Sequence, residues 1–260
     1  MLAAVLSGLV LAILGWPALT QPTRWVLGGG SGDFPSIAWG MWQVSNSLPA
    51  LPSHHPDIFY PQGATLLIAD LPGAIALAPL TWLAGPVVSF NALQALHPIL
   101  AAAAAAALAG RGSLTGGAAA GLALGLSPVV LSSLHNGNPD VTPVFWIPLA
   151  ALCASRISRG WGWTLLAGLS VGASAWFNPY VGVMSAVAAL IMAPWRHPRS
   201  LVAGAVAAAT AGLFILSVRH TLDASSAMIA KPPVDVRFAS PGAADLTGWL
   251  WPVVRAQQDG

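Results

Sequence analysis

Aspartates are the side chains of this protein that could do acid–base or metal chemistry, and they are few. The chain has 260 residues and eight acidic side chains, all of them aspartate. Charged residues make up 7% of it, against about 25% in a soluble protein. Seven of the eight fall in segments that hydropathy places outside the bilayer core, on one common side. A carboxylate retained in so apolar a chain needs a reason, such as catalysis, ligand binding or helix capping.

Asp33 follows a run of glycine and serine and directly precedes an amphipathic stretch at about 34–48. An aspartate at this position can cap a helix, because its carboxylate accepts hydrogen bonds from free backbone amides, and Pro35 suits the first helical turn. The same carboxylate at a membrane surface could act as a general base or bind a divalent cation such as Mg²⁺ or Mn²⁺. Position alone leaves both hypotheses open.

A second group of candidate ligands follows in the same polar stretch: His54, His55 and Asp57. Imidazole and carboxylate groups can bind a divalent cation or a phosphate. Adjacent histidines point apart, however, and no second cluster has a spacing typical of a zinc site. A solvated loop is therefore the alternative interpretation.

His135, Asn136 and Asn138 form a third polar group, between two apolar runs. Asn138 followed by Pro139 and Asp140 is typical of a helix start, with a cap, a first-turn proline and an acid that favours the helix dipole. This structural reason does not extend to His135 and Asn136. They are candidate substrate-binding residues.

Asp70 and Asn178 interrupt apolar runs. An ionised group costs about 2.5 to 3.5 kcal/mol at the bilayer centre and less near the interface. Asp70 lies close to the start of its run, so we expect it at the interface. Asn178 with Pro179 predicts a turn between two half-helices, with the lining of a polar cavity as the alternative.

The elements that position these residues are apolar helices. Hydrophobic residues make up 56% of the chain, and apolar runs near the length of a membrane span recur along it. The fold class predicted is all-α: a polytopic transmembrane bundle of about seven to eight hydrophobic segments. Residues 1–218 would form the membrane module and 219–260 an extracytoplasmic polar tail. The runs are 2–19, 66–84, 87–110, 114–134, 141–155, 161–194 (two half-runs) and 200–218.

The first loop predicted, at about 21–65, is extracytoplasmic and carries a juxtamembrane helix with Trp39 and Trp42 on one face. Three short turns hold five arginines and no acid, and the positive-inside rule places them in the cytoplasm. Asp33 is then outside, provided that segment 66–84 does not cross fully. The protein is expected to be integral to a bacterial cytoplasmic membrane. The arginines are Arg111, Arg156, Arg159, Arg196 and Arg199.

Several function classes are excluded by what the sequence lacks. It has no Walker motif, Rossmann glycine pattern, His-Glu-x-x-His or Gly-x-Ser-x-Gly, which argues against ATPases, NAD enzymes, zincin proteases and lipase-like hydrolases. A net charge of +2 gives no reason to expect nucleic acid as a partner. The single cysteine, Cys153, is predicted to be a packing residue. Gly117, Gly121 and Gly125 recur every four residues and predict a flat strip for close helix packing.

One order of short motifs resembles the bacterial multi-pass glycosyltransferases of the GT-C fold, the class that includes protein mannosyltransferase-like enzymes. The resemblance covers roughly the first 180 residues. Its motifs are Gly32-Asp33 with Trp39 and Trp42, His55-Pro56, Tyr60-Pro61-Gln62-Gly63, Ala78-Pro79-Leu80, Gly85-Pro86 with Asn91, Ser127-Pro128, His135-Asn136-Gly137-Asn138 and Trp146-x-Pro148-Leu149.

The resemblance implies transfer of a sugar from a polyprenyl-phosphate carrier to an acceptor on the outer side of the membrane. It assigns Asp33 the role of base or metal contact. In that hypothesis His54, His55, Asp57, His135, Asn136 and Asn138 line the outer pocket, and Arg219 or Arg237 neutralises the phosphate leaving group. Family members usually continue for further spans, so the resemblance also predicts a short or truncated form and a second polypeptide that supplies missing spans.

Two alternatives come from other classes. The first is a small transporter or flippase-like protein in which Asp70 and Asn178 form a polar path. The second is a non-catalytic truncated partner of a glycosyltransferase, which would pack on another chain through the strip of Gly117, Gly121 and Gly125.

Overall fold

The described part of the chain is built from helices alone. In the computed structural model, residues 1–28, 34–49, 70–110, 112–136 and 142–228 are described, with side chains as far as residue 216. Within these ranges there are α-helices, the 3₁₀ helix η2 and no strand, so the all-α prediction is confirmed. The elements are α1 (Leu2–Leu14), α2 (Trp16–Thr20), α3 (Phe34–Ser47), α4 (Leu71–Ala76), α5 (Ala78–Ala84), α6 (Pro86–Ala109), α7 (Leu114–Gly125), α8 (Pro128–His135), α9 (Trp146–Ala154), η2 (Ile157–Arg159), α10 (Trp161–Phe177), α11 (Pro179–Met192) and α12 (Arg199–Met228).

Three of the described helical stretches are long and apolar enough to cross a membrane: Pro86–Ala109, Leu114–His135 and Arg199–Leu216. A span needs about 20 apolar residues at a rise of about 1.5 Å each. The middle stretch combines α7 and α8, with a break where the Ser127 hydroxyl accepts a hydrogen bond from Val130 N. These three helices indicate membrane association. The further spans of a bundle of seven to eight, and a long first loop, stay predictions.

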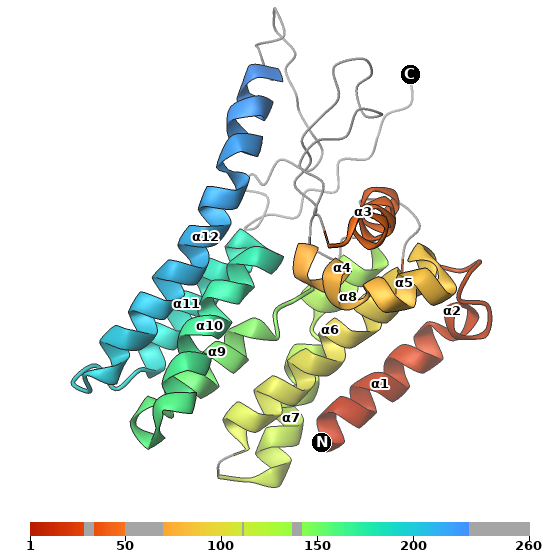
Figure 1. Cartoon of the computed structure of the whole chain (residues 1–260). Coiled ribbons are helices and arrows are strands. Elements are labelled where there is room, and N and C mark those ends of the chain that lie inside the picture. Colours follow the sequence, from red (N-terminus) through yellow and green to blue (C-terminus); the bar gives the residue numbers. More distant parts are fainter. Residues whose placement is uncertain (29–33, 50–69, 111, 137–141, 229–260) are drawn as a thin grey trace, which may run out of the picture.

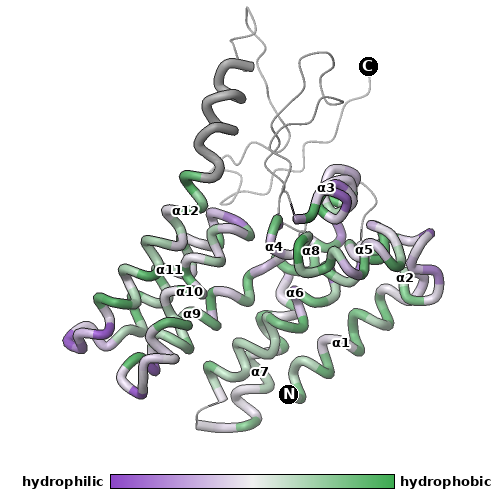
Figure 2. Tube along the Cα trace, in the orientation of Figure 1, coloured by the Kyte–Doolittle hydropathy of each residue, from purple (hydrophilic) through white to green (hydrophobic). Residues whose placement is uncertain are grey.

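Two groups of long helices lie side by side, and short helices cover one end (Figure 1). In one group α1, α6 and α7 pack together, and in the other α9, α10, α11 and α12 do; α6 contacts α9 and so joins them. The helices α3, α4 and α5 pack on each other and on α6. The N-terminus and the turns that precede α7, α10 and α12 lie at the opposite end from α3 (Figure 1). Hydrophilic residues gather at the turns before α10 and α12 and in α3 (Figure 2).

Helix α3 confirms the amphipathic helix predicted at 34–48. Its buried face repeats at Ile37, Met41 and Val44, and packs against Phe90 and Leu93 of α6. Apolar residues at this spacing share one side of a helix, which is why the remaining side of α3 stays polar or exposed. Helix α3 is thereby fixed across the end of α6.

The glycine strip of α7 faces α6 and α1, so the predicted close packing is confirmed. A Cβ on Gly121 would lie 2.5 Å from both Ala102 O and the Ala3 Cβ, and one on Gly125 would lie 2.7 Å from Pro98 O. Any larger residue would push α7 away from its neighbours. Because helices of the same chain cover the strip, it is not a free surface for a second polypeptide.

The turn predicted at Asn178 is also confirmed. The Asn178 side chain accepts hydrogen bonds from Tyr180 N (2.8 Å) and Val181 N (3.3 Å), which makes it the N-cap of α11. Pro179 occupies the first turn, as capping chemistry favours. The run at 161–194 therefore forms an antiparallel pair, α10 and α11.

Three predicted segments differ in the structure. Residues 70–84 contain two helices of six and seven residues, about 9 and 10 Å long, too short to cross a bilayer. The helix in the apolar run at 141–155, α9, is shorter than that run, because it has nine residues and begins only after Pro143. Helix α12 continues past residue 218 to Met228, so the predicted boundary between module and tail lies inside a helix.

Candidate functional site

Several buried polar side chains meet around the middle of α6. Asp70 comes just before α4, has a left-handed backbone (φ 55°, ψ 46°) and is 1% exposed. Its Oδ1 accepts a hydrogen bond from Gly73 N at 2.9 Å and caps α4. A Cβ on Gly73 would lie 2.6 Å from that oxygen, so only glycine leaves room for the carboxylate. The structure therefore places Asp70 inside the protein, and its expected position near the membrane interface stays a prediction.

His97 lies opposite Asp70, halfway along the 24-residue helix α6. Its Nε2 is 3.4 Å from Asp70 Oδ2, and its Nδ1 is 2.7 Å from Thr142 Oγ1. The three residues are 0 to 2% exposed. A histidine whose two ring nitrogens face a carboxylate and a hydroxyl is held in one orientation, as a catalytic or ligand-binding imidazole needs to be. Three segments far apart in the sequence thus converge on one ring.

Gln94 lies one helical turn before His97 on the same side of α6. It is fully buried, and neither its Oε1 nor its Nε2 has a hydrogen-bond partner among the described residues. Pro98 has no N–H, so the backbone carbonyl of Gln94 also loses its usual helical donor. Each buried polar group left unpaired costs about 1 to 3 kcal/mol, and such groups mark strained or functional positions.

Aromatic side chains form one wall of this site. The ring centroids of Phe145 and Phe177 lie 5.8 and 6.3 Å from that of His97, and Trp146 packs 4.8 Å from Phe145 and 5.2 Å from Phe177. The Trp146 Nε1 is buried and has no hydrogen-bond partner in the described part of the chain. A few convergent polar groups beside aromatic surfaces are what small-molecule sites typically offer. We call Asp70, Gln94, His97, Thr142 and these three aromatic residues the polar centre.

Most of the residues predicted for the site lie outside the described ranges, and the structure does not test them: Asp33, His54, His55, Asp57, Asn138 and Arg237. Arg219 lies in α12, beyond the described side chains. Phe34, the neighbour of Asp33, packs edge-on against Phe90 with a centroid distance of 4.9 Å. Phe90 is about two turns before His97 on α6. The helix that follows Asp33 is therefore anchored on the element that carries the polar centre.

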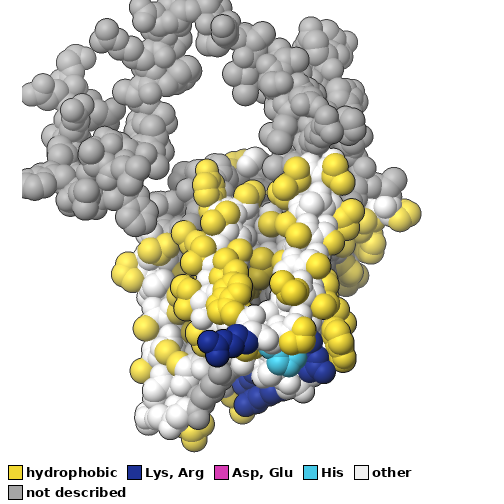
Figure 3. Space-filling model, turned by 90° about the vertical axis from the view of Figure 1, so that its left-hand side faces the viewer, with side chains coloured by type: hydrophobic (Ala, Val, Ile, Leu, Met, Phe, Trp, Pro, Cys, Tyr) yellow, Lys and Arg dark blue, Asp and Glu magenta, His cyan; other side chains and the backbone are white. Residues whose placement is uncertain are grey.

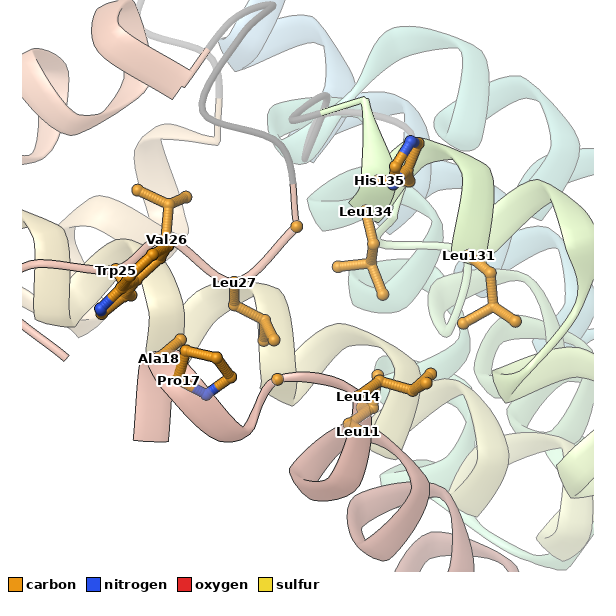
Figure 4. A pocket seen from close by; sticks show the side chains of 12 residues that line it. Leu11, Leu14, Pro17, Ala18, Trp25, Val26, Leu27, Leu131, Leu134 and His135 are labelled. Atoms are coloured by element: carbon orange, nitrogen blue, oxygen red, sulfur yellow. The ribbon is translucent and has the colours of Figure 1, made fainter. Parts of the chain in front are cut away.

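His135 and Asn136 are described and exposed, and they are not part of the polar centre. His135 ends α8 at the edge of an apolar cavity of about 440 Å³ between α1, α2, residues 25–28 and α8 (Figure 4). Gly28 allows the close approach there, because it has φ +94° and a Cβ would overlap Leu134 O. The other residues predicted for the outer pocket lie outside the described ranges, so the place of His135 and Asn136 in that pocket stays a prediction.

Asn91, a residue of the resembling motifs, holds the segment that leads toward Asp33. Its Oδ1 accepts a hydrogen bond from Leu27 N at 2.7 Å, and its Nδ2 donates to Trp25 O at 2.8 Å and Pro22 O at 3.0 Å. All hydrogen-bonding groups of this buried amide except one lone pair are thus used by one loop. Asn91 and Gln94 are three residues apart on α6, and only Asn91 is satisfied by the described protein.

The sequence interpretation missed Gln94, His97 and Thr142. Gln94 and His97 lie within the apolar run at 87–110, which was interpreted only as a membrane span. Polar side chains inside a predicted span indicate a functional site, and this signal could have identified them. No group of three or more His, Cys, Asp or Glu side chains that could hold a metal ion occurs among the described residues. Asp70 and His97 supply only two side chains of these types at the polar centre. A bound Mg²⁺ or Mn²⁺ stays a prediction.

No family model, curated protein or solved structure matches this chain.

Proposed function

We propose that the protein is a membrane glycosyltransferase of GT-C type that moves a sugar from a polyprenyl-phosphate donor to an acceptor hydroxyl. The observation that carries the proposal is the polar centre, where the Gln94 amide has no hydrogen-bond partner among the described residues and the His97 ring lies beside Phe145 and Phe177. Sugars present hydroxyl donors and acceptors on their edges and apolar C–H faces, which such a site complements. The order of short motifs described above supports the same class.

Asp33 keeps the role that the resemblance implies, as the base that takes the proton of the acceptor hydroxyl or as a cation contact. The acceptor oxygen then forms a bond to the anomeric carbon, and the bond from that carbon to the phosphate oxygen breaks. In this proposal Asp70, Gln94 and His97 bind the sugar hydroxyls, and His97 is oriented by its contacts to Asp70 and Thr142. The polar centre thereby positions the sugar for attack.

The side of the membrane that the site faces is inferred from the positive-inside rule. Arg156, Arg159, Arg196 and Arg199 flank the turns before α10 and α12, at the end of the molecule opposite α3 (Figure 1). If this end faces the cytoplasm, α3 and the start of α6 lie on the outer side of the cytoplasmic membrane. A donor with a membrane-embedded polyprenyl chain could enter between helices from that side. The membrane lipid and the lipid-linked donor are the partners that this proposal needs.

The test is sugar transfer in liposomes that contain the purified full chain and a polyprenyl-phosphate hexose with a labelled sugar. Release of polyprenyl phosphate and labelled product are both measured. We expect Asp33→Asn to lower transfer by about 10² to 10⁴, and His97→Gln to raise the KM for the donor. His197→Gln, at the arginine end, is the matched control and should leave both constants unchanged. Equal sugar transfer by Asp33→Asn and wild type would show that Asp33 has no catalytic role and serves only as a helix cap.

A transporter is the second candidate, because Asp70 and His97 face each other halfway along a helix able to span the membrane. Ionisable residues at such depth are typical of proton and substrate paths. Flux across vesicles that depends on Asp70, without any sugar transfer from polyprenyl-linked donors, would favour it. A non-catalytic partner remains the third hypothesis, but it cannot dock through the glycine strip, which α1 and α6 cover.

A further inference from the structure

Four arginines gather at one end of the α9 to α12 group, with no acidic partner in the described part of the chain. They are Arg156, Arg159, Arg196 and Arg199, with His197 among them. The only acidic side chain that the structure describes is Asp70, in the polar centre. Figure 3 shows arginine and histidine side chains together below an apolar surface on this face. The positive charge at this end is thus not neutralised by the described protein.

Two of these arginines are held in place rather than left in solvent. The Arg156 guanidinium lies 4.6 Å from the Trp163 ring centroid, and that of Arg199 lies 5.0 Å from the Trp161 centroid. Arg199 also donates to Ser158 O at 3.5 Å. Stacking on aromatic rings orients a guanidinium at low entropic cost and leaves its edge free for an anion. The Arg156 Nε is buried and has no hydrogen-bond partner among the described residues.

An apolar groove runs from this end between α11 and α12. Both helices pack on α10 but make little contact with each other, so α10 forms the floor. The groove holds a cavity of about 170 Å³ and is lined mainly by small side chains, with Trp195 and Ser200 near its charged end. Its lining includes Ala186, Ala189, Ala203, Gly204 and Ala207. A narrow apolar channel that opens toward a cluster of guanidinium groups matches a lipid with an anionic headgroup.

We propose that this end of the protein binds one anionic phospholipid, with its phosphate at the arginines and one acyl chain in the groove between α11 and α12. Guanidinium groups bind phosphate oxygens in pairs of hydrogen bonds. Basic pockets between membrane helices bind the headgroups of anionic lipids. The positive-inside rule alone accounts for the charge, but it does not account for a groove that begins beside it.

The first test compares lipids retained by the purified full chain in detergent, by native mass spectrometry, with phosphatidylglycerol and phosphatidylcholine of the same acyl chains. Wild type should retain phosphatidylglycerol preferentially. The double variant Arg196→Gln with Arg199→Gln should bind it about 25-fold more weakly, at about fivefold for each charge. Arg24→Gln removes an exposed arginine near α2 and should change nothing. Equal retention of the two lipids by wild type, or an equal loss in the Arg24 variant, would overturn the proposal.

The second test fills the groove without touching the charge. An added Cβ at Gly204 or at Gly212, both on α12, meets no atom within 4 Å, so a side chain can start from either position without a backbone clash. Gly204 lines the groove and Gly212 does not. Gly204→Leu should lower the retention of phosphatidylglycerol several-fold, and Gly212→Leu should leave it unchanged. Unchanged retention in Gly204→Leu, or displacement of the lipid by inorganic phosphate alone, would show that no acyl chain is seated there.

Discussion

Replacing Gln94 with methionine should make the protein more stable and less active. Methionine has a similar volume, so the packing of α6 is kept. The change removes two buried polar groups that have no partner among the described residues. At about 1 to 3 kcal/mol for each unpaired group, we expect a gain of about 2 kcal/mol or more in the free energy of unfolding. If the polar centre binds a sugar, transfer falls at the same time, because the amide no longer contacts the substrate.

Asn91→Leu provides the matched control on the same helix. This substitution removes three hydrogen bonds to Leu27 N, Trp25 O and Pro22 O, and leaves those backbone groups unpaired. We expect it to destabilise the protein by about 3 kcal/mol or more. Each of the two variants thus deletes a buried side-chain amide, at positions three residues apart. We expect the first to raise and the second to lower the free energy of unfolding.

The assay is thermal unfolding of the purified chain in detergent, followed by circular dichroism, beside the liposome transfer assay. A gain of about 2 kcal/mol corresponds to a rise of about 4 to 8 °C in the unfolding midpoint. If Gln94→Met lowers the midpoint as Asn91→Leu does, the amide is a satisfied structural group and the polar centre loses its main support as a ligand site. Higher stability with unchanged sugar transfer would show that Gln94 does not bind the sugar.

Two further predictions concern the helix packing. Gly121→Ala should destabilise the chain by about 1 to 3 kcal/mol, because its Cβ would lie 2.5 Å from Ala102 O. Gly162→Ala places a Cβ that meets no atom within 4 Å and should stabilise α10 by about 0.5 to 1 kcal/mol. Equal unfolding midpoints for the two variants would contradict the packing. Asn178→Ala removes the cap of α11 and should lower the free energy of unfolding by about 0.5 to 2 kcal/mol. The measurement is hydrogen exchange at the amides of residues 180 and 181, which should become faster. Unchanged exchange at these amides would show that the cap bonds do not stabilise the helix.

The local elements followed from the sequence because their causes are local. Apolar runs predicted helices, the Asn178-Pro179 pair predicted a helix end, and the spacing of Gly117, Gly121 and Gly125 predicted a tightly packed face. Each of these features depends on neighbours within about four residues along the chain. The sequence also identified an amphipathic helix after Asp33, which the structure shows as α3 packed on α6.

The sequence by itself determined an all-helical, apolar protein and single helix ends such as the one capped by Asn178. Only the tertiary structure decided which polar residues meet, because Asp70, His97 and Thr142 are brought together across separations of 27 and 45 residues. Neither helical period nor capping chemistry acts over such distances. The same holds for Asn91 and Gln94, two buried amides on one helix: whether each finds partners depends on which loop packs against its side of α6, and that is a property of the assembled fold.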